Sequence, residues 1–158
     1  MTHPMPPLAL HPLLRGNFSQ SNMALPWNFA AVDDWTTMQI GYRVHGVTGE
    51  RLVSTDEGGW HPDWWVFASN YFADPFLIDL RDGESGFPVL FAHHGAGRWD
   101  AIRIADSAAQ FEGWLRALGE LAAQPQQAAE FVELHMPRNE FWAEAATGFR
   151  EEDEDSDT

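Results

Sequence analysis

Two runs of aromatic and aliphatic residues, separated by a short polar break, constrain the fold of this chain most strongly. Trp64–Ala68 and Phe76–Leu80 are rich in the residue types that favour a pleated, buried surface. Between them, Asn70–Pro75 is polar and ends in a proline, which cannot donate a ladder hydrogen bond and therefore suits the first residue of a strand. The pattern predicts two interior strands, the second of which begins at about Pro75 or Phe76.

Alternating apolar and polar residues predict further strands on either side of this pair. The predicted ranges are Met38–Val44, a short Leu52–Val53, Pro88–His93 and Arg98–Ile104. Turn signals separate them, including the Asp-Gly pair within Arg81–Gly86, which supplies the positive φ that a hairpin turn requires.

The spacing of apolar residues changes to a helical period after Asp106. Ser107 and Gln110 have the spacing of a capping box, in which each side chain binds a free amide at the start of a helix. A second helix is predicted after Pro125, and a third over Asn139–Ala146, ended by Gly148. The first helix carries one apolar stripe at helical spacing, made of Phe111, Trp114, Leu115, Leu118 and Leu121.

Together these elements predict an α+β fold: a single domain with a twisted, mainly antiparallel sheet of about five to six strands, flanked by C-terminal helices. A length of 158 residues suits one domain. We expect residues 1–36 to be an irregular, proline-rich lead-in packed on the domain, with a short helix around Phe29–Thr36. The α+β domain is predicted over 37–149, and the carboxylate run over 150–158 is predicted to be a disordered acidic tail.

Charge disfavours direct binding of nucleic acid. The formal net charge is −15, and all nine basic residues are arginine. Because six carboxylates lie in 151–158, the remainder still carries −9. Such a protein repels phosphate backbones, whereas it would steer a basic protein partner towards itself, unless acidity serves only solubility.

The absence of cysteine excludes a disulfide framework, a thiolate nucleophile and a cysteine-based zinc site. The first residues lack a basic segment and are broken by prolines, so neither a signal peptide nor a membrane span is expected. We therefore expect a soluble, cytoplasmic protein that does not bind membranes.

The histidines do not form a metal-binding motif. Adjacent His93 and His94 on a strand would point to opposite faces, and His61 with Asp63 lacks a third ligand. Ser85 lies in a near match to the nucleophile elbow, but a strand rather than a helix is predicted after it.

Asp74 and Asp79 could pair for acid–base catalysis, but hydrogen bonding to turn and strand backbone suits them better. We therefore predict no enzymatic activity, no cofactor and no metal ion. An enzyme that uses His61, Asp63 or His93 remains the alternative, and it requires these side chains to share a cleft.

Several motifs along the chain follow the order found in one known family. They are Ile40–Tyr42, Trp65–Ala68, Ala73–Asp79, Pro88–Leu90, Gly97–Trp99 and Ile104–Ser107, the last leading to Phe111 and Trp114. In this order they resemble the SUKH superfamily. The resemblance implies a compact α+β domain that binds rather than catalyses. The superfamily includes many bacterial immunity proteins, which neutralise a cognate toxin that is often a nuclease, and a fungal cell-wall-assembly regulator.

The leading hypothesis is thus an immunity-type protein that neutralises a bacterial toxin, a basic nuclease-like domain, by direct contact. A regulatory or adaptor module with a non-toxin partner is the alternative. We expect the contact surface on the acidic loops around 56–63 and 82–87. The predicted partner-binding residues are Asp56, Glu57, Trp60, Asp63, Asp82 and Glu84.

Overall fold

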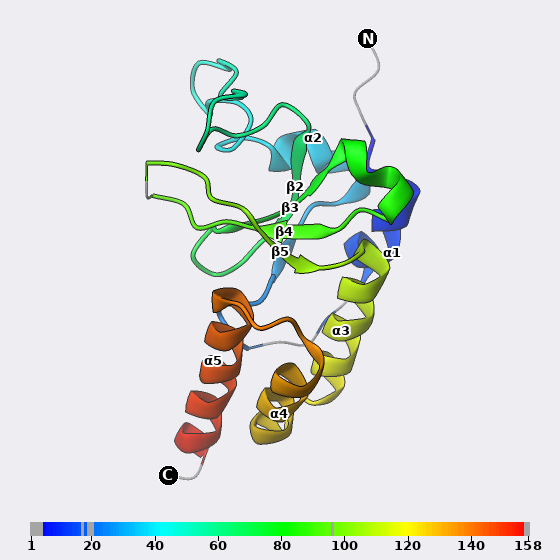
Figure 1. Cartoon of the computed structure of the whole chain (residues 1–158), viewed down its shortest axis with the longest axis vertical. Coiled ribbons are helices and arrows are strands. Elements are labelled where there is room, and N and C mark those ends of the chain that lie inside the picture. The colour runs from blue at the N-terminus through cyan, green and yellow to red at the C-terminus, as the bar shows by residue number, and fades with distance from the viewer. Residues whose placement is uncertain (1–4, 17, 19–20, 96, 157–158) are drawn as a thin grey trace.

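The fold combines one antiparallel sheet with three C-terminal helices, as predicted (Figure 1). The structure is a computed structural model that describes residues 5–16, 18, 21–95 and 97–156, with side chains up to Asp153. The strands are β1 Asn28–Phe29, β2 Trp64–Ser69, β3 Pro75–Asp79, β4 Val89–Phe91 and β5 Ile102–Ala105. The helices are α1 His11–Arg15, α2 Trp35–Met38, α3 Ala108–Glu120, α4 Pro125–His135 and α5 Glu140–Ser156. Short 3₁₀ helices cover Leu8–Leu10, Val32–Asp34 and Leu80–Ser85.

The two apolar runs on either side of the polar break form the neighbouring strands β2 and β3. The strand order is β1-β2-β3-β4-β5, and each neighbouring pair is antiparallel. All five residues of β3 are buried, which explains why its first four residues are apolar rather than alternating with polar ones; the fifth is Asp79. A register shift between Val66 and Ala68 places a bulge in β2.

The predicted strand Met38–Val44 does not form. The chain leaves α2 through turns, with Gly41 at a φ of 93°, and only isolated bridges at Ile40 and Val44 remain. The side chain of Gln39 explains the difference, because it accepts from the Val66 amide at 2.9 Å and donates to the Val66 carbonyl at 2.7 Å. The amide of Gln39 therefore satisfies the edge of β2 where a strand would have paired.

Leu52–Val53 likewise forms no strand: Val53 makes one isolated bridge, and the neighbouring Arg51 makes another. The other predicted strands are shorter than expected and are represented by β4 and β5. The segment predicted as a hairpin loop, Arg81–Gly86, contains most of a 3₁₀ helix that ends at Gly86, with a φ of 75°.

The two faces of the sheet carry separate apolar clusters. One face packs on α1, α3 and α5 and forms the main core, with Phe67, Phe76 and Ile78 pointing into it. The opposite face carries Val66 and Leu77, which pack with Trp60 beneath the long segment between α2 and β2. Figure 1 shows this segment above the sheet and the three C-terminal helices below it.

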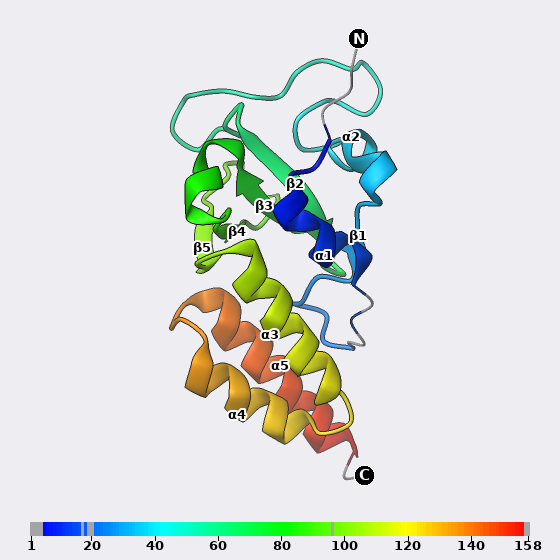
Figure 2. The ribbon, with the colours of Figure 1, turned by 90° about the vertical axis from the view of Figure 1, so that its right-hand side faces the viewer.

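The lead-in is less irregular than predicted. Leu10, Leu13 and Leu25 are fully buried in the main core, and β1 adds a strand to the sheet edge. Figure 2 shows α1 lying against the sheet, above the upper end of α3. The short helix predicted around Phe29–Thr36 is represented by the 3₁₀ turn at Val32–Asp34 followed by α2.

The C-terminal helices begin as predicted, but α5 extends much further. Ser107 caps α3 by accepting from the Gln110 amide at 3.0 Å, and Pro125 begins α4. Gly148 does not end α5. Its role is in packing, because an added Cβ there would lie only 3.0 Å from the Asn22 side chain. The helix continues to Ser156 where the sequence predicted a disordered tail from 150, and residues 157–158 lie outside the described residues.

Candidate functional site

The predicted acidic residues lie at two ends of the sheet. Asp56 and Glu57 are exposed and lie against the β4–β5 connection, where the Glu57 carboxylate is 3.7 Å from Arg98 and the Trp99 amide donates to Gly58. Asp82 and Glu84 follow β3, in the 3₁₀ helix at the other end. Among the described residues, no hydrogen bond or ion pair joins the first pair to the second.

Asp63 lies beside the second of these regions. Its carboxylate is 3.4 Å from Arg81 and 3.8 Å from His61, and its carbonyl accepts from the Leu80 amide. These contacts hold the end of the long loop against the end of β3. Asp63 is therefore already paired within the protein, unlike the exposed Glu84.

Trp60 was predicted to anchor an interface, but the structure buries it. Its side chain is only 1% exposed, and its indole N–H donates to the Trp64 carbonyl at 3.0 Å. The ring packs edge-on against Trp64 and Trp99. Trp60 thus holds the loop on the sheet and offers no surface to a partner.

The residues of the enzyme alternative lie in two separate places. His61 and Asp63 pair near Arg81, whereas His93 lies beside Asp74 at the opposite end of β3. In the described part of the chain, no group of three or more histidine, cysteine or carboxylate side chains is placed to hold a metal ion.

Asp79 has a structural role. Burial alone would raise its pKa, but hydrogen bonds from the Arg81 guanidinium and amide outweigh that effect and hold the pKa of Asp79 below its ordinary value. The carboxylate also caps the 3₁₀ helix that follows β3. This arrangement fits the backbone-bonding role that the sequence favoured for Asp79.

A patch that the sequence analysis did not select lies at the β2–β3 turn. Tyr71 is 64% exposed and Phe72 48% exposed, and the two rings meet edge-on at 5.5 Å. Met23 and Trp27, 53% and 63% exposed, belong to the segment beside them. Backbone bonds from Tyr71 to Met23 and from Trp27 to Ser69 join the two segments. We call Met23, Trp27, Tyr71 and Phe72 the turn surface.

A buried asparagine builds this turn. Asn70 is only 4% exposed. Its side-chain oxygen accepts from the Phe72 amide at 2.9 Å and from the Asp74 amide at 3.0 Å. Its nitrogen lies 3.4 Å from the Ala24 carbonyl and from the Asp74 carboxylate. The backbone of Asn70 and Asp74 closes the turn with a further bond. The exposed rings therefore project from a backbone that is held at every residue.

A second clamp ties the turn to the neighbouring connection. The buried Asp74 carboxylate accepts from the His94 amide at 3.0 Å, lies 2.6 Å from the His94 ring nitrogen and 3.4 Å from that of His93. Ala73 adopts a φ of 67°, which is unfavourable for a residue with a Cβ. Its carbonyl accepts from the Tyr42 hydroxyl at 2.7 Å. Burial, with a contribution from the Asp74 charge, raises the pKa of Tyr42, so this donor stays protonated.

An acidic groove adjoins the turn surface. It has a volume of about 490 Å³ and lies between residues 21–24, Phe72 and α5. Glu144, Glu151 and Glu152 line it, and no arginine does. Burial raises the pKa of Glu152, although a hydrogen bond from the Ser21 hydroxyl at 3.0 Å partly opposes that effect. The groove therefore places three carboxylates beside exposed apolar side chains.

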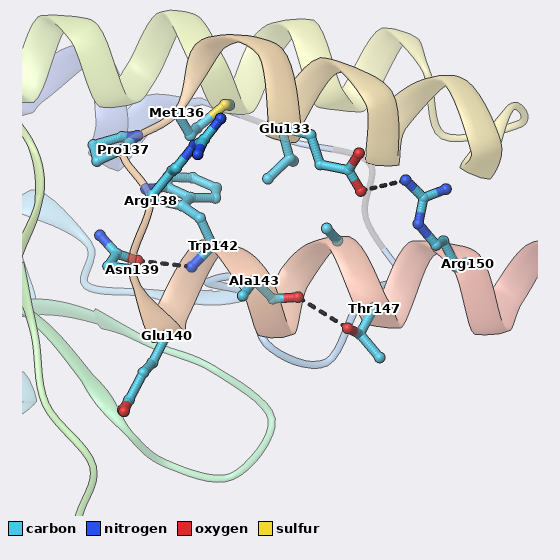
Figure 3. Close-up of a pocket in the computed structure, with 12 residues that line it drawn as sticks. Glu133, Met136, Pro137, Arg138, Asn139, Glu140, Trp142, Ala143, Thr147 and Arg150 are labelled. Atoms are coloured by element: carbon cyan, nitrogen blue, oxygen red, sulfur yellow. Dashed lines mark hydrogen bonds and ion pairs between the residues drawn. The ribbon is translucent and has the colours of Figure 1, made fainter.

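A larger pocket of about 740 Å³ opens between α4 and α5 (Figure 3). Its floor is apolar, with Trp142 among the buried residues. Two glutamates and two arginines line it, so its formal charge is balanced. Figure 3 shows Arg150 bridging the two helices to Glu133, Arg138 at the other end, and Glu140 pointing away from the pocket. This pocket therefore lacks the negative character that a basic partner would need.

The sequence contained a signal for the turn surface. Tyr71 and Phe72 are two large apolar residues inside an otherwise polar break, between Asn70 and Asp74. Apolar residues in a tight turn cannot both face the core, so exposure was to be expected there. The acidic groove could not be found in this way, since it depends on α5 continuing past Gly148.

Comparison with known proteins adds no relative to this picture. No protein-family model matches the chain, and neither a curated protein nor a solved structure matches it at a significant level. None of the described helices is long and apolar enough to cross a membrane.

Proposed function

We propose that this chain is an immunity-type binding protein that neutralises a basic toxin domain by direct contact. The observation that carries the proposal is the turn surface: Tyr71 and Phe72 stay exposed on a turn that buried Asn70 fixes. Most other large aromatic side chains of the described residues pack into the two clusters. Rigid exposed aromatic residues are typical of binding hot spots.

Electrostatics favour a basic partner. The net charge of −15 speeds the approach of a positively charged domain and disfavours nucleic acid as a direct ligand. A nuclease toxin must itself attract phosphate, so a basic surface is expected on it. An acidic protein that covers such a surface would block substrate access without any chemistry of its own.

The proposal is tested by growth protection in bacteria. Each open reading frame next to the gene for this chain is expressed from an inducible promoter, with or without the chain. We expect one of them to arrest growth alone and to be tolerated when the chain is present. If no neighbouring product is toxic, or if toxicity persists despite a stable complex, the immunity role is wrong. A stable complex with a harmless partner would instead favour the adaptor role.

A further inference from the structure

We infer that the turn surface and the adjoining acidic groove form one docking site for a basic segment of a partner protein. Apolar side chains of that segment pack on Tyr71 and Phe72, and its lysine or arginine side chains enter the groove beside α5. The inference rests on the proposed function in one respect, that the partner is a basic protein, and it departs from the acidic loops that the sequence favoured.

The turn surface forms the apolar half of the site. Four large side chains, each about half exposed or more, lie on two segments joined by backbone hydrogen bonds. Phe72 and Met23 also line the groove, so the turn surface adjoins it. An apolar patch of this kind is uncommon on a surface that has no interaction role.

The turn is already rigid before a partner arrives. Asn70 holds the Phe72 and Asp74 amides, while Asp74 is tied to His94 and the Ala73 carbonyl to Tyr42. The positive φ of Ala73 is maintained by these surrounding contacts. Binding therefore requires little further ordering of the backbone, which improves affinity.

The groove sets the charge of the occupant. Its three glutamates face residues 21–24 with no arginine among the lining residues. The raised pKa of Glu152 means that its carboxylate is costly to keep ionised in place, and a lysine or arginine beside it would offset that cost. Glu144 and Glu151 are exposed and form no ion pair with another described residue. A cation entering the groove would thus pair with carboxylates that are free to receive it.

Other occupants fit less well. Nucleic acid would be repelled by the three carboxylates, and a second copy would bring the same net charge of −15. The α4–α5 pocket in Figure 3 has balanced charge and so would not select a cation. A basic protein segment with apolar side chains satisfies both halves of the site.

The site is tested with a defined probe, a helical peptide of alternating leucine and lysine clusters, measured by isothermal titration calorimetry. A peptide with glutamate in place of lysine is the charge control. We expect only the lysine peptide to bind. The double variant Tyr71→Ser/Phe72→Ser should weaken it by about 100-fold, since two anchors are removed. Glu144→Gln/Glu151→Gln should weaken it by about 10-fold and flatten its dependence on salt.

The matched control is Asp82→Asn/Glu84→Gln, which removes the same charge from the loop after β3. It should change affinity by less than about 2-fold, apart from the long-range effect of net charge. The inference is overturned if this control weakens binding as much as the groove variant, or if the aromatic variant binds like wild type while its circular dichroism is unchanged. Growth protection that survives the Tyr71 and Phe72 substitutions would reject this site and leave the immunity role standing. If the wild-type chain protects against no neighbouring product, while the lysine peptide still binds at this site, the immunity role is rejected and the docking site stands.

Discussion

Replacing Asn70 by alanine should show how much the turn depends on one buried amide. The substitution removes two hydrogen bonds of ordinary length, to the amides of Phe72 and Asp74, and two contacts at 3.4 Å. A typical bond contributes about 0.5–1.5 kcal/mol, and leaving a buried amide unpaired adds to the loss. With the long contacts taken as minor, the expected loss is about 2–3 kcal/mol. A domain with roughly 5–15 kcal/mol of stability would remain folded.

The measurement is urea unfolding followed by far-ultraviolet circular dichroism, because eight tryptophans complicate a fluorescence signal. With an m-value of about 2 kcal/mol/M, the midpoint should fall by about 1–1.5 M with little change in slope. The control is Asn28→Ala, on the exposed edge strand, where the side chain makes one marginal contact at 3.5 Å. Its midpoint should move by less than about 0.3 M.

The same pair of variants separates stability from binding. Asn70→Ala should also weaken the lysine peptide, because Tyr71 and Phe72 would then project from a mobile turn. If the urea midpoint of Asn70→Ala shifts from wild type by no more than that of Asn28→Ala, the Asn70 side-chain amide does not organise the turn. Hydrogen exchange at the Phe72 and Asp74 amides checks the cause, since both should lose protection.

Three other substitutions test the charges and the helix anchor. Glu152→Gln keeps an acceptor for Ser21 but removes a carboxylate whose pKa burial raises, so it should stabilise the protein at neutral pH; the gain should vanish in melting curves below about pH 4. Asp79→Asn should be destabilising at neutral pH, because Arg81 lowers the Asp79 pKa, and the difference from wild type should shrink as pH falls through that lowered value. Trp142→Phe removes an indole bond of 2.8 Å to a β5 carbonyl and should cost about 1–2 kcal/mol in urea unfolding, whereas a loss near zero would mean that this bond does not anchor α5.

Much of the fold was predictable because its centre is specified locally. β2 and β3 are runs of strand-favouring residues, and α3 begins at the predicted cap, where Ser107 accepts from the Gln110 amide and the Gln110 side chain accepts from the Asp106 amide. The prediction failed where a side chain replaced a backbone partner. Gln39 bonds both polar groups of Val66, and a single buried amide of that kind leaves no periodic trace in sequence.

The extent of α5 was missed for a similar reason. Gly148 looks like a helix end, but its role is to let the Asn22 side chain approach the helix, where it donates to the Ala145 carbonyl at 2.7 Å. Buried Phe149 and the Arg150–Glu133 ion pair then hold the helix beyond that point. Contacts between residues more than a hundred positions apart therefore decided a boundary that local signals had placed elsewhere.

The candidate site shows the same contrast between local and distant information. Trp60 looked exposed because glycines precede it and His61-Pro62 follows, yet a cluster formed by Trp64 and Trp99 covers it. Tyr71 lies in a much shorter turn and is exposed. A loop location alone thus says little about exposure, since long loops that cover a sheet face carry their own apolar residues inward.

The position of the turn surface follows from the same two strands that define the sheet. β3 is buried at all five residues and β2 at its last four, so the turn between them is attached to a well-packed part of the domain. A partner that grips Tyr71 and Phe72 there loses little affinity to motion of the scaffold. The long segment between α2 and β2 carries Asp56 and Glu57 in a loop outside the sheet, where isolated bridges and loop hydrogen bonds, such as that from the Trp99 amide to Gly58, support the backbone. If binding energy is concentrated where the backbone is most rigid, substitutions at the turn should reduce affinity through faster dissociation, whereas substitutions at Asp56 and Glu57 should act only through slower association.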